Sequence, residues 1–191
     1  MNDKGAIIAV SAPSGTGKTT IVRQILKSIP ELVFSVSATT RKKRHNEKEG
    51  VDYFFISENE FLKKIEKNEF VEWEKFYDYF YGTYRSFIEE NISKGKPVIL
   101  EIDVHGALNL KRIYPEAHLI FILPPSLEVL VERLKNRKTE SEEDLKKRIE
   151  RVKLELSMKD KFDYFVVNND LDKAVSETKS LIRKIISKEH N

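Results

Sequence analysis

The sequence contains no cysteine, a single tryptophan and no long apolar run. The lack of cysteine excludes disulfide bridges and thiolate metal sites, and it suits a reducing compartment. A membrane-spanning helix needs roughly 18 apolar residues in a row, and no apolar run here approaches that length. The opening stretch MNDKGAIIAVSA also lacks the basic region and cleavage pattern of a signal peptide. We therefore expect a soluble, cytoplasmic protein without a membrane partner.

A large excess of either charge is missing as well. The chain has 34 Lys and Arg against 31 Asp and Glu, which gives a formal net charge of +3. Such a small imbalance does not indicate a polyanionic partner such as nucleic acid. The length of 191 residues and the hydrophobic content of 40% are ordinary for a globular protein with one domain, or one core with insertions.

Short apolar runs alternate with amphipathic segments along the chain. Strands are expected at 6–10, 32–37, 52–56, 70–76, 97–103, 118–124 and 164–168. Helices are expected at 16–29, 58–68, 84–95, 105–113, 126–137, 141–158 and 171–188. Strand–helix alternation at both ends predicts an α/β fold, in which helices flank a parallel sheet. An insertion of more mixed character interrupts this order at roughly 35–90.

The first expected strand runs into the stretch APSGTGKT, which a helix follows at once. This stretch fits the phosphate-binding loop (P-loop) pattern G-x-x-x-x-G-K-[ST], except that Ala12 replaces the first glycine. Gly15 and Gly17 allow the backbone to wrap a phosphate, whose oxygens then meet the N–H groups at the helix start. A glycine-rich turn that only caps a helix is the simpler alternative. The residues expected at ATP are Ser11, Ala12, Pro13, Ser14, Gly15, Thr16, Gly17, Lys18, Thr19 and Thr20.

Three side chains near this loop suit phosphates and a magnesium ion. Lys18 is placed to reach the outer phosphates, and the Thr19 hydroxyl is placed to bind Mg²⁺. ATPases with this loop usually add an acidic residue on a second strand near the same ion. Asp103 ends the expected strand 97–103, so its carboxylate emerges at the sheet edge that faces the loop. A helix N-cap is the alternative role for Asp103, and the two roles are chemically compatible.

The stretch TTRKKRHNEKEG carries five cations within ten residues, namely Arg41, Lys42, Lys43, Arg44 and Lys48. Such a run is typical of a solvated loop, of a nuclear-import or nucleic-acid patch, or of a set of clamps for one small anion. A guanidinium group holds phosphate oxygens in a fork, whereas an ammonium group acts as a point charge. The two arginines are therefore the candidates for an anion clamp, and the lysines are the candidates for solvated side chains.

The chain resembles the guanylate kinases over about residues 5–185, because these motifs occur in that family's order and spacing: SAPSGTGKTT, SVSATTRKKR, GVDYFF, FVEW, FYGT, LEIDVHGA, FILPPS, and RLKNR with SEEDLKKRI. The resemblance implies transfer of the γ-phosphoryl group of ATP to GMP, and to dGMP at some level, with Mg²⁺ as cofactor. It also implies a P-loop NTPase-type sheet with an inserted mixed-sheet acceptor subdomain and a helical lid. The single domain 1–191 would then divide into a core (1–34, 95–132 and 160–191), a GMP-binding subdomain (about 35–94) and a lid (about 133–159).

The resemblance further implies residue roles, which are carried over by position. The GMP-binding residues would be Ser37, Arg41, Arg44, Tyr53, Glu72, Tyr81, Thr83, Glu101 and Asp103. The catalytic residues would be Lys18, Arg41, Arg133, Arg137 and Arg148, the last three closing over the transferring phosphoryl group. Thr19 and Asp103 would serve the magnesium ion, partly through water. Departures from the family pattern include Glu101 where Asp is frequent, and His105 in place of Gln.

These residue types suit guanine and a phosphate acceptor. Guanine presents two donors, N1–H and N2–H₂, which the Glu72 carboxylate can accept together, whereas N1 of adenine is an acceptor and would leave it unpaired. Hydroxyl donors such as Ser37 and Thr83 suit guanine O6 and N7. The acceptor phosphate is already an oxyanion, because its second pKa is about 6. No general base is needed, so we expect no catalytic role for the histidines His45, His105, His118 and His190. We also expect them to bind no metal, because no two of them have the spacing of metal ligands.

Three other functions are weighed against this one. Guanylate-kinase-like modules of scaffold proteins bind peptides and have a decayed ATP site, which the intact GKT sequence argues against. A nucleic-acid-binding protein would need a broad basic face, which this sequence lacks. A kinase for another nucleoside monophosphate is the hardest alternative to separate. The expected partners are ATP and GMP, without nucleic acid, in a monomer or a small homo-oligomer.

Overall fold

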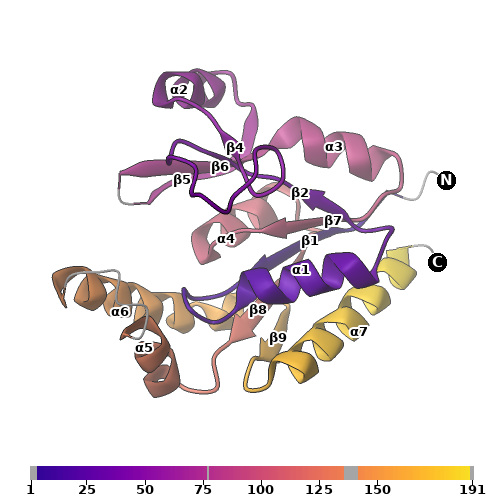
Figure 1. Ribbon diagram of the computed structural model, residues 1–191. Coiled ribbons are helices and arrows are strands. Elements are labelled where there is room, and N and C mark those ends of the chain that lie inside the picture. Colours follow the sequence, from indigo (N-terminus) through magenta and orange to yellow (C-terminus); the bar gives the residue numbers. More distant parts are fainter. Residues whose placement is uncertain (1–3, 77, 136–141, 190–191) are drawn as a thin grey trace.

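The structure is a computed structural model that describes residues 4–76, 78–135 and 142–189 (Figure 1). The strands are β1 (Ile7–Ser11), β2 (Val33–Ser35), β3 (Ala38–Thr39), β4 (Phe54–Phe55), β5 (Phe70–Phe76), β6 (Tyr79–Tyr84), β7 (Val98–Glu101), β8 (His118–Leu123) and β9 (Tyr164–Val167). The helices are α1 (Lys18–Ser28), α2 (Glu58–Glu66), α3 (Arg85–Ser93), α4 (Val104–Ile113), α5 (Leu127–Lys135), α6 (Glu142–Ser157) and α7 (Leu171–Glu189), with a 3₁₀ turn at Lys159–Lys161.

Five parallel strands form the central sheet in the order β2-β7-β1-β8-β9. Side chains alternate along each strand, so the sheet has one apolar layer on each face. Ile8 and Val10 of β1 pack against α1 and α7, which lie side by side (Figure 1). Ile7 and Ala9 face the opposite layer, together with α3 and α4. Because β1 and β7 are parallel neighbours, the residues that follow them meet at one edge of the sheet.

A second sheet rises from this edge, in the order β4-β3-β6-β5. It is mixed, because β3 pairs parallel with β4 but antiparallel with β6, and β5 pairs antiparallel with β6. Helix α2 covers it, and the predicted cap is confirmed: the Ser57 hydroxyl accepts from the Glu60 N–H at 3.2 Å. Phe61 of α2 packs in one buried cluster with Ala38, Phe70 and Phe80 of the sheet. Strand β5 also packs against α4, which brings this sheet to the edge where β1 and β7 end.

Helices α5 and α6 form a pair at the same end of the central sheet (Figure 1). Leu130 and Leu134 of α5 pack against Val152 of α6. The pair adjoins the loop after β1, because a Cβ added at Gly15 would lie 3.1 Å from Leu134 and 3.2 Å from Leu130. The loop after β1 therefore has the second sheet and the helix pair close to it.

The predicted fold class is confirmed, whereas several element bounds differ from prediction. Strands β3 and β6 were not predicted. β3 has only two residues, and β6 forms a strand because it pairs with β5, which its own sequence does not indicate. The helix expected at 84–95 begins at Arg85, because Tyr84 still belongs to β6. The strand expected at 52–56 keeps only Phe54 and Phe55. Among the described residues, no helix has the length and apolar character needed to cross a bilayer.

Candidate active site

The loop between β1 and α1 has the conformation of a phosphate cradle. Gly15 and Gly17 have φ angles of 89° and 94°, in the left-handed region that favours glycine, and Gly17 is the N-cap of α1. The Thr16 hydroxyl donates to the Pro13 carbonyl at 2.8 Å, which closes the turn. From the far side, buried Asn168 donates its side-chain N–H to the Thr16 carbonyl at 2.6 Å. These bonds hold the loop with its N–H groups at the start of a helix, where an anion is favoured.

A continuous cleft extends from this loop to the second sheet. Its first part encloses about 400 Å³ and is lined by loop residues 12–20 together with residues of β5, β7 and α6. Its second part, of about 940 Å³, extends beneath the basic stretch. The two parts share four residues, Thr19, Tyr53, Tyr81 and Glu101. A ligand in one part can therefore meet a ligand in the other.

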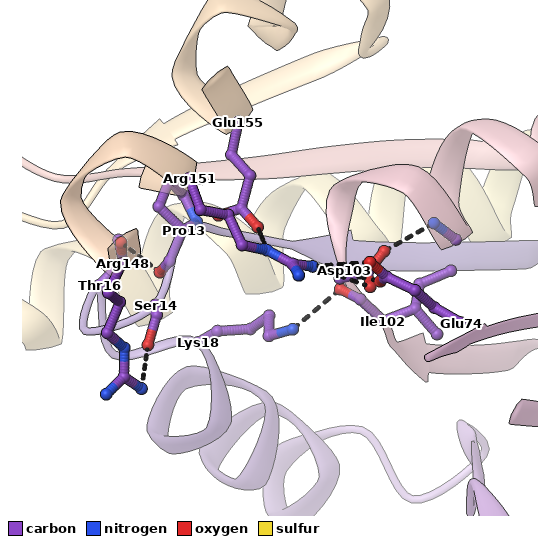
Figure 2. A network of polar contacts seen from close by, with 11 residues as sticks. Pro13, Ser14, Thr16, Lys18, Glu74, Ile102, Asp103, Arg148, Arg151 and Glu155 are labelled. Carbon is purple, nitrogen blue, oxygen red and sulfur yellow. Dashed lines mark hydrogen bonds and ion pairs between the residues drawn. The ribbon is translucent and has the colours of Figure 1, made fainter. Parts of the chain in front are cut away.

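Lys18 and Thr19 point to the end of β7. The Lys18 ammonium donates to the Ile102 carbonyl at 2.8 Å (Figure 2), and the Thr19 hydroxyl donates to the Glu101 carboxylate. Asp103 is the N-cap of α4 and accepts from the Gly106 N–H at 2.7 Å. Its carboxylate thus has the N-cap role that was the alternative to magnesium binding. Two carboxylates, Glu101 and Asp103, stand within this end of the cleft, and Glu101 is the one in contact with Thr19.

Glu72 is a buried carboxyl at the wall of the first cavity. It is 8% exposed and accepts from the Thr83 hydroxyl at 2.5 Å. Helix α4 approaches it closely at Gly106, where an added Cβ would lie 2.6 Å from Glu72 Oε2. Burial raises the pKa of Glu72 to about 7, an effect that the nearby Asp103 charge adds to and the Thr83 hydrogen bond opposes. The structure thus places an oriented acceptor at the position predicted to recognise the base.

Arg41 and Arg44 differ in their surroundings. The Arg41 guanidinium forms two hydrogen bonds to Glu47, at 2.7 and 3.0 Å, and lies 5.5 Å from the Tyr53 ring centre. The bond to Glu47 raises the pKa of Arg41 and lowers the pKa of the Glu47 carboxyl. Arg44 donates its backbone N–H to Glu47 at 2.7 Å, while its side chain is exposed beside the second cavity. One carboxylate therefore fixes the loop that carries both arginines.

The two tyrosines predicted at the acceptor phosphate lie together. The ring centres of Tyr53 and Tyr81 are 5.9 Å apart, and both residues line both parts of the cleft. Burial raises the pKa of Tyr53 to about 12, and the Glu101 charge adds to this effect. Tyr53 therefore keeps its hydroxyl proton at neutral pH and can donate it to an anion. Ser37, also predicted here, lines the first cavity beside them.

Of the remaining predicted residues, some lie at the cleft and others do not. Arg148 of α6 donates to the Ser14 hydroxyl at 2.8 Å, so it stands beside the P-loop (Figure 2). Arg133 lies on α5 and is not among the residues that line either part of the cleft. Arg137 lies outside the described residues. Ser11 is fully buried at the end of β1, so it stands behind the loop rather than at the cavity.

Known proteins are similar to this chain over nearly its whole length. A family model described as guanylate kinase matches residues 4–185. The chain belongs to the guanylate kinase family. It is 48% identical over 180 residues to the guanylate kinase of Thermotoga maritima, with 94% of this chain and 87% of that protein covered. It is 49% identical over 183 residues to the guanylate kinase of Salinibacter ruber, with 95% and 97% covered. The crystal structure of guanylate kinase from Anaplasma phagocytophilum matches with a TM-score of 0.79 at 31% identity, covering 95% of this chain and 86% of that one.

This guanylate kinase family member also has site residues that the sequence motifs did not single out. Asn168 supports the P-loop, Glu47 holds Arg41, and Arg151 of α6 lies in the cleft between Glu74 and Asp103 (Figure 2). The sequence did contain a pattern that could have indicated Glu47, because this carboxylate follows Arg41 by six residues in a loop crowded with cations. The other two act on residues far away in the chain, and no local signal indicated their partners.

Proposed function

We propose that this member of the guanylate kinase family transfers the γ-phosphoryl group of ATP to GMP, giving ADP and GDP. The observation that carries the proposal is that a P-loop and a buried, oriented carboxyl, Glu72, open into one continuous cleft. A phosphate donor and a base with two N–H donors can therefore bind next to each other. The proposal includes a cytoplasmic location, which the absence of cysteine suits.

ATP would be held through its phosphates by the loop that joins β1 to α1. The backbone N–H groups and Lys18 favour the β- and γ-phosphates. Magnesium fits the donor set at the end of β7, because Thr19, Glu101 and Asp103 all supply the oxygen ligands that this ion prefers. Thr19 and these carboxylates would hold the ion, with water between them where the reach is long. When bound, the ion neutralises charge on the phosphates.

GMP would lie between the second sheet and the basic stretch. Glu72 would accept the guanine N1–H and N2–H₂. The Thr83 hydroxyl, predicted as a donor to guanine O6 or N7, is buried and donates to Glu72 instead, so it would keep this carboxylate in place. The phosphate would meet Arg41 and Arg44, together with the hydroxyls of Tyr53 and Tyr81, which also donate to oxyanions. Ser37 completes the predicted set near the base.

The chemical step then needs alignment and charge relief rather than proton removal. The acceptor phosphate oxygen attacks the γ-phosphorus in line, the bond to the bridging oxygen breaks, and ADP leaves. Lys18 of the P-loop and Arg148 beside the loop would face the phosphates, where charge is spread in the transition state. The proposal keeps Arg133 and Arg137 as further lid cations, and it keeps the division into core (1–34, 95–132, 160–191), GMP-binding subdomain (about 35–94) and lid (about 133–159).

The proposed activity is tested by ADP release from ATP with GMP, dGMP, AMP, CMP or UMP as acceptor. We expect kcat/KM for GMP to exceed that for AMP, CMP and UMP by at least about 100-fold, because a site built for hydrogen bonds rejects bases that leave it unpaired. dGMP should be accepted, since no residue here is assigned to the 2′-OH. GMP binding without any ADP release would instead favour an inactive binding module, and a preference for AMP would contradict the role of Glu72.

A second prediction concerns four of the five cations of the basic stretch. Arg41→Gln and Arg44→Gln should each weaken GMP binding about tenfold or more, which corresponds to about 1.4 kcal/mol. The physical reason is the loss of a guanidinium fork on the acceptor phosphate. Lys42→Gln and Lys43→Gln are the matched controls in the same loop, and both side chains are exposed. They should change GMP affinity, measured by calorimetry, by less than about twofold.

Two outcomes would contradict this division of the basic stretch. Equal losses from all four substitutions would indicate a diffuse charge effect rather than a clamp. Tight binding of duplex or single-stranded nucleic acid by the wild type near 150 mM salt, with a steep salt slope, would indicate a nucleic-acid patch instead.

A further inference from the structure

A second arginine of α6 joins three parts of the active-site cleft. Arg151 lies one turn after Arg148, and its side chain extends toward β5 and the end of β7 (Figure 2). Its Nη2 donates to both carboxylate oxygens of Glu74, at 3.0 and 3.1 Å, and lies 3.5 Å from Asp103 Oδ2. Its Nε donates to Glu155 on its own helix at 2.8 Å. One guanidinium is thus shared by carboxylates of the second sheet, of the central sheet edge and of α6.

The same guanidinium also packs on the face of β5 that forms the cleft wall. Its central carbon lies 4.2 Å from the Phe76 ring centre, a distance typical of a cation–π contact. Side chains alternate along a strand, so Phe76, Glu74 and Glu72 share one face of β5, and all three line the first cavity. Arg151 therefore contacts the two residues that continue the wall on which Glu72 stands.

Arg148 and Arg151 connect α6 to opposite halves of the cleft. Arg148 reaches Ser14 of the P-loop, while Arg151 reaches Glu74 of β5. The position of α6 that brings Arg148 beside the P-loop is thus the position in which Arg151 contacts the wall formed by β5. Val152 of the same helix is buried against α5, so the helix presents both arginines from a packed support.

We propose that Arg151 is a positioning residue for GMP, which acts by holding α6 against β5 through Glu74. This inference rests on the proposed function. Arg151 does not need to touch either substrate, because its effect passes through Glu74 and Phe76 to the wall that carries Glu72. It also balances three carboxylates, Glu74, Asp103 and Glu155, which without it would face a cleft that takes anionic substrates.

The proposal predicts an effect on KM for GMP rather than on kcat. A ligand whose binding-competent state is only partly populated has a weaker apparent affinity, in proportion to that population. Loss of the Arg151–Glu74 contact lowers the population of the assembled cleft in the free enzyme. Saturating substrates restore the assembly through their own contacts, so turnover at saturation should change little.

The test is a double-mutant cycle with Arg151→Gln, Glu74→Gln and the double variant. Each single substitution should raise KM and the calorimetric Kd for GMP by about three- to tenfold, while kcat changes by less than about twofold. Because both single substitutions remove the Arg151–Glu74 contact, the double variant should lose clearly less GMP affinity than the two single losses combined. Lys147→Gln is the matched control on α6, since this exposed lysine pairs with Glu143 of its own helix; it should leave KM unchanged.

Each other outcome counts against the proposal. Additive losses in the double variant, or an unchanged KM for GMP, would show that the contact does not position the acceptor site. A parallel loss of kcat and of melting temperature would show that Arg151 only supports the fold. If the wild type neither binds GMP nor releases ADP with it, the proposed function fails and this role fails with it. Normal wild-type turnover with unaltered variants would overturn the Arg151 role alone.

Discussion

Lys18→Ala should reduce kcat/KM for phosphoryl transfer by at least about a thousandfold while the fold remains intact. Removing one preorganised donor from a transition-state site typically costs 10²–10³ in kcat, and Lys18 also carries a full charge toward the phosphates. Its ammonium donates a hydrogen bond to the Ile102 carbonyl, and its side chain is outside the apolar layers. The coupled ADP assay measures the loss, and thermal unfolding shows whether the fold is retained.

Lys94→Ala is a suitable control for this experiment. Lys94 is exposed, caps the C-terminal end of α3 and pairs with Glu90 one turn earlier, and it does not line the cleft. It should keep wild-type activity and nearly the wild-type melting temperature, since such exposed pairs contribute little to stability. Turnover by Lys18→Ala within a few-fold of the wild type would contradict the assignment of the P-loop. Loss of activity together with a large drop in melting temperature would indicate unfolding instead.

The P-loop could be predicted from the sequence because its chemistry lies in one short stretch. A buried strand, two glycines, Lys18 and a helix start follow one another within about a dozen residues, so local conformation alone brings the donors together. The parallel sheet was predictable for a related reason, since runs such as PVILEID and HLIFILP are apolar on both faces. Each of these patterns lies within one short segment, so it can be recognised without knowledge of tertiary contacts.

Contacts between segments that are distant in the sequence could not be predicted from local sequence patterns. Arg151 and Glu74 are separated by 77 residues, and each alone looks like an exposed charge on a helix or a strand. The same holds for Asn168, whose partner Thr16 lies 152 residues earlier. Glu101 was predicted with the acceptor residues, and the contact with Thr19 depends on the register between β1 and β7, in which Val10 pairs with Glu101. Sequence order does not specify such registers by itself.

Glu72→Gln should weaken GMP and at the same time stabilise the ligand-free protein at alkaline pH. An amide keeps one acceptor oxygen but loses the charge that strengthens both guanine bonds, and charge-assisted bonds are worth about 1.5–3 kcal/mol. We therefore expect kcat/KM for GMP to drop at least about tenfold, with much less change in KM for ATP. Equal losses for both nucleotides would indicate misfolding rather than lost base recognition.

The stability effect follows from the direction of the pKa shift. Burial raises the pKa of Glu72 from the ordinary 4.5 to about 7 in the folded protein. The stability that this carboxyl contributes is fully present below its unfolded pKa and is lost as pH rises through the folded value. At pH 8 the wild type keeps a buried charge that the glutamine variant lacks. The variant should then be more stable by roughly 3 kcal/mol, the linkage that a shift of this size implies, which is several degrees in melting temperature. This advantage should shrink as pH falls toward 5.

The pH dependence of GMP binding tests the same carboxyl from the ligand side. Guanine needs the ionised form as acceptor, so GMP affinity of the wild type should fall as pH drops below about 7, the raised pKa of Glu72. The GMP phosphate also titrates, with a second pKa of about 6, and Glu72→Gln retains that contribution alone. The ratio of variant to wild-type Kd, measured by calorimetry from pH 5.5 to 8.5, removes the phosphate contribution and should grow with pH. A ratio that stays constant across this range would show that the ionised carboxylate of Glu72 is not what binds the base.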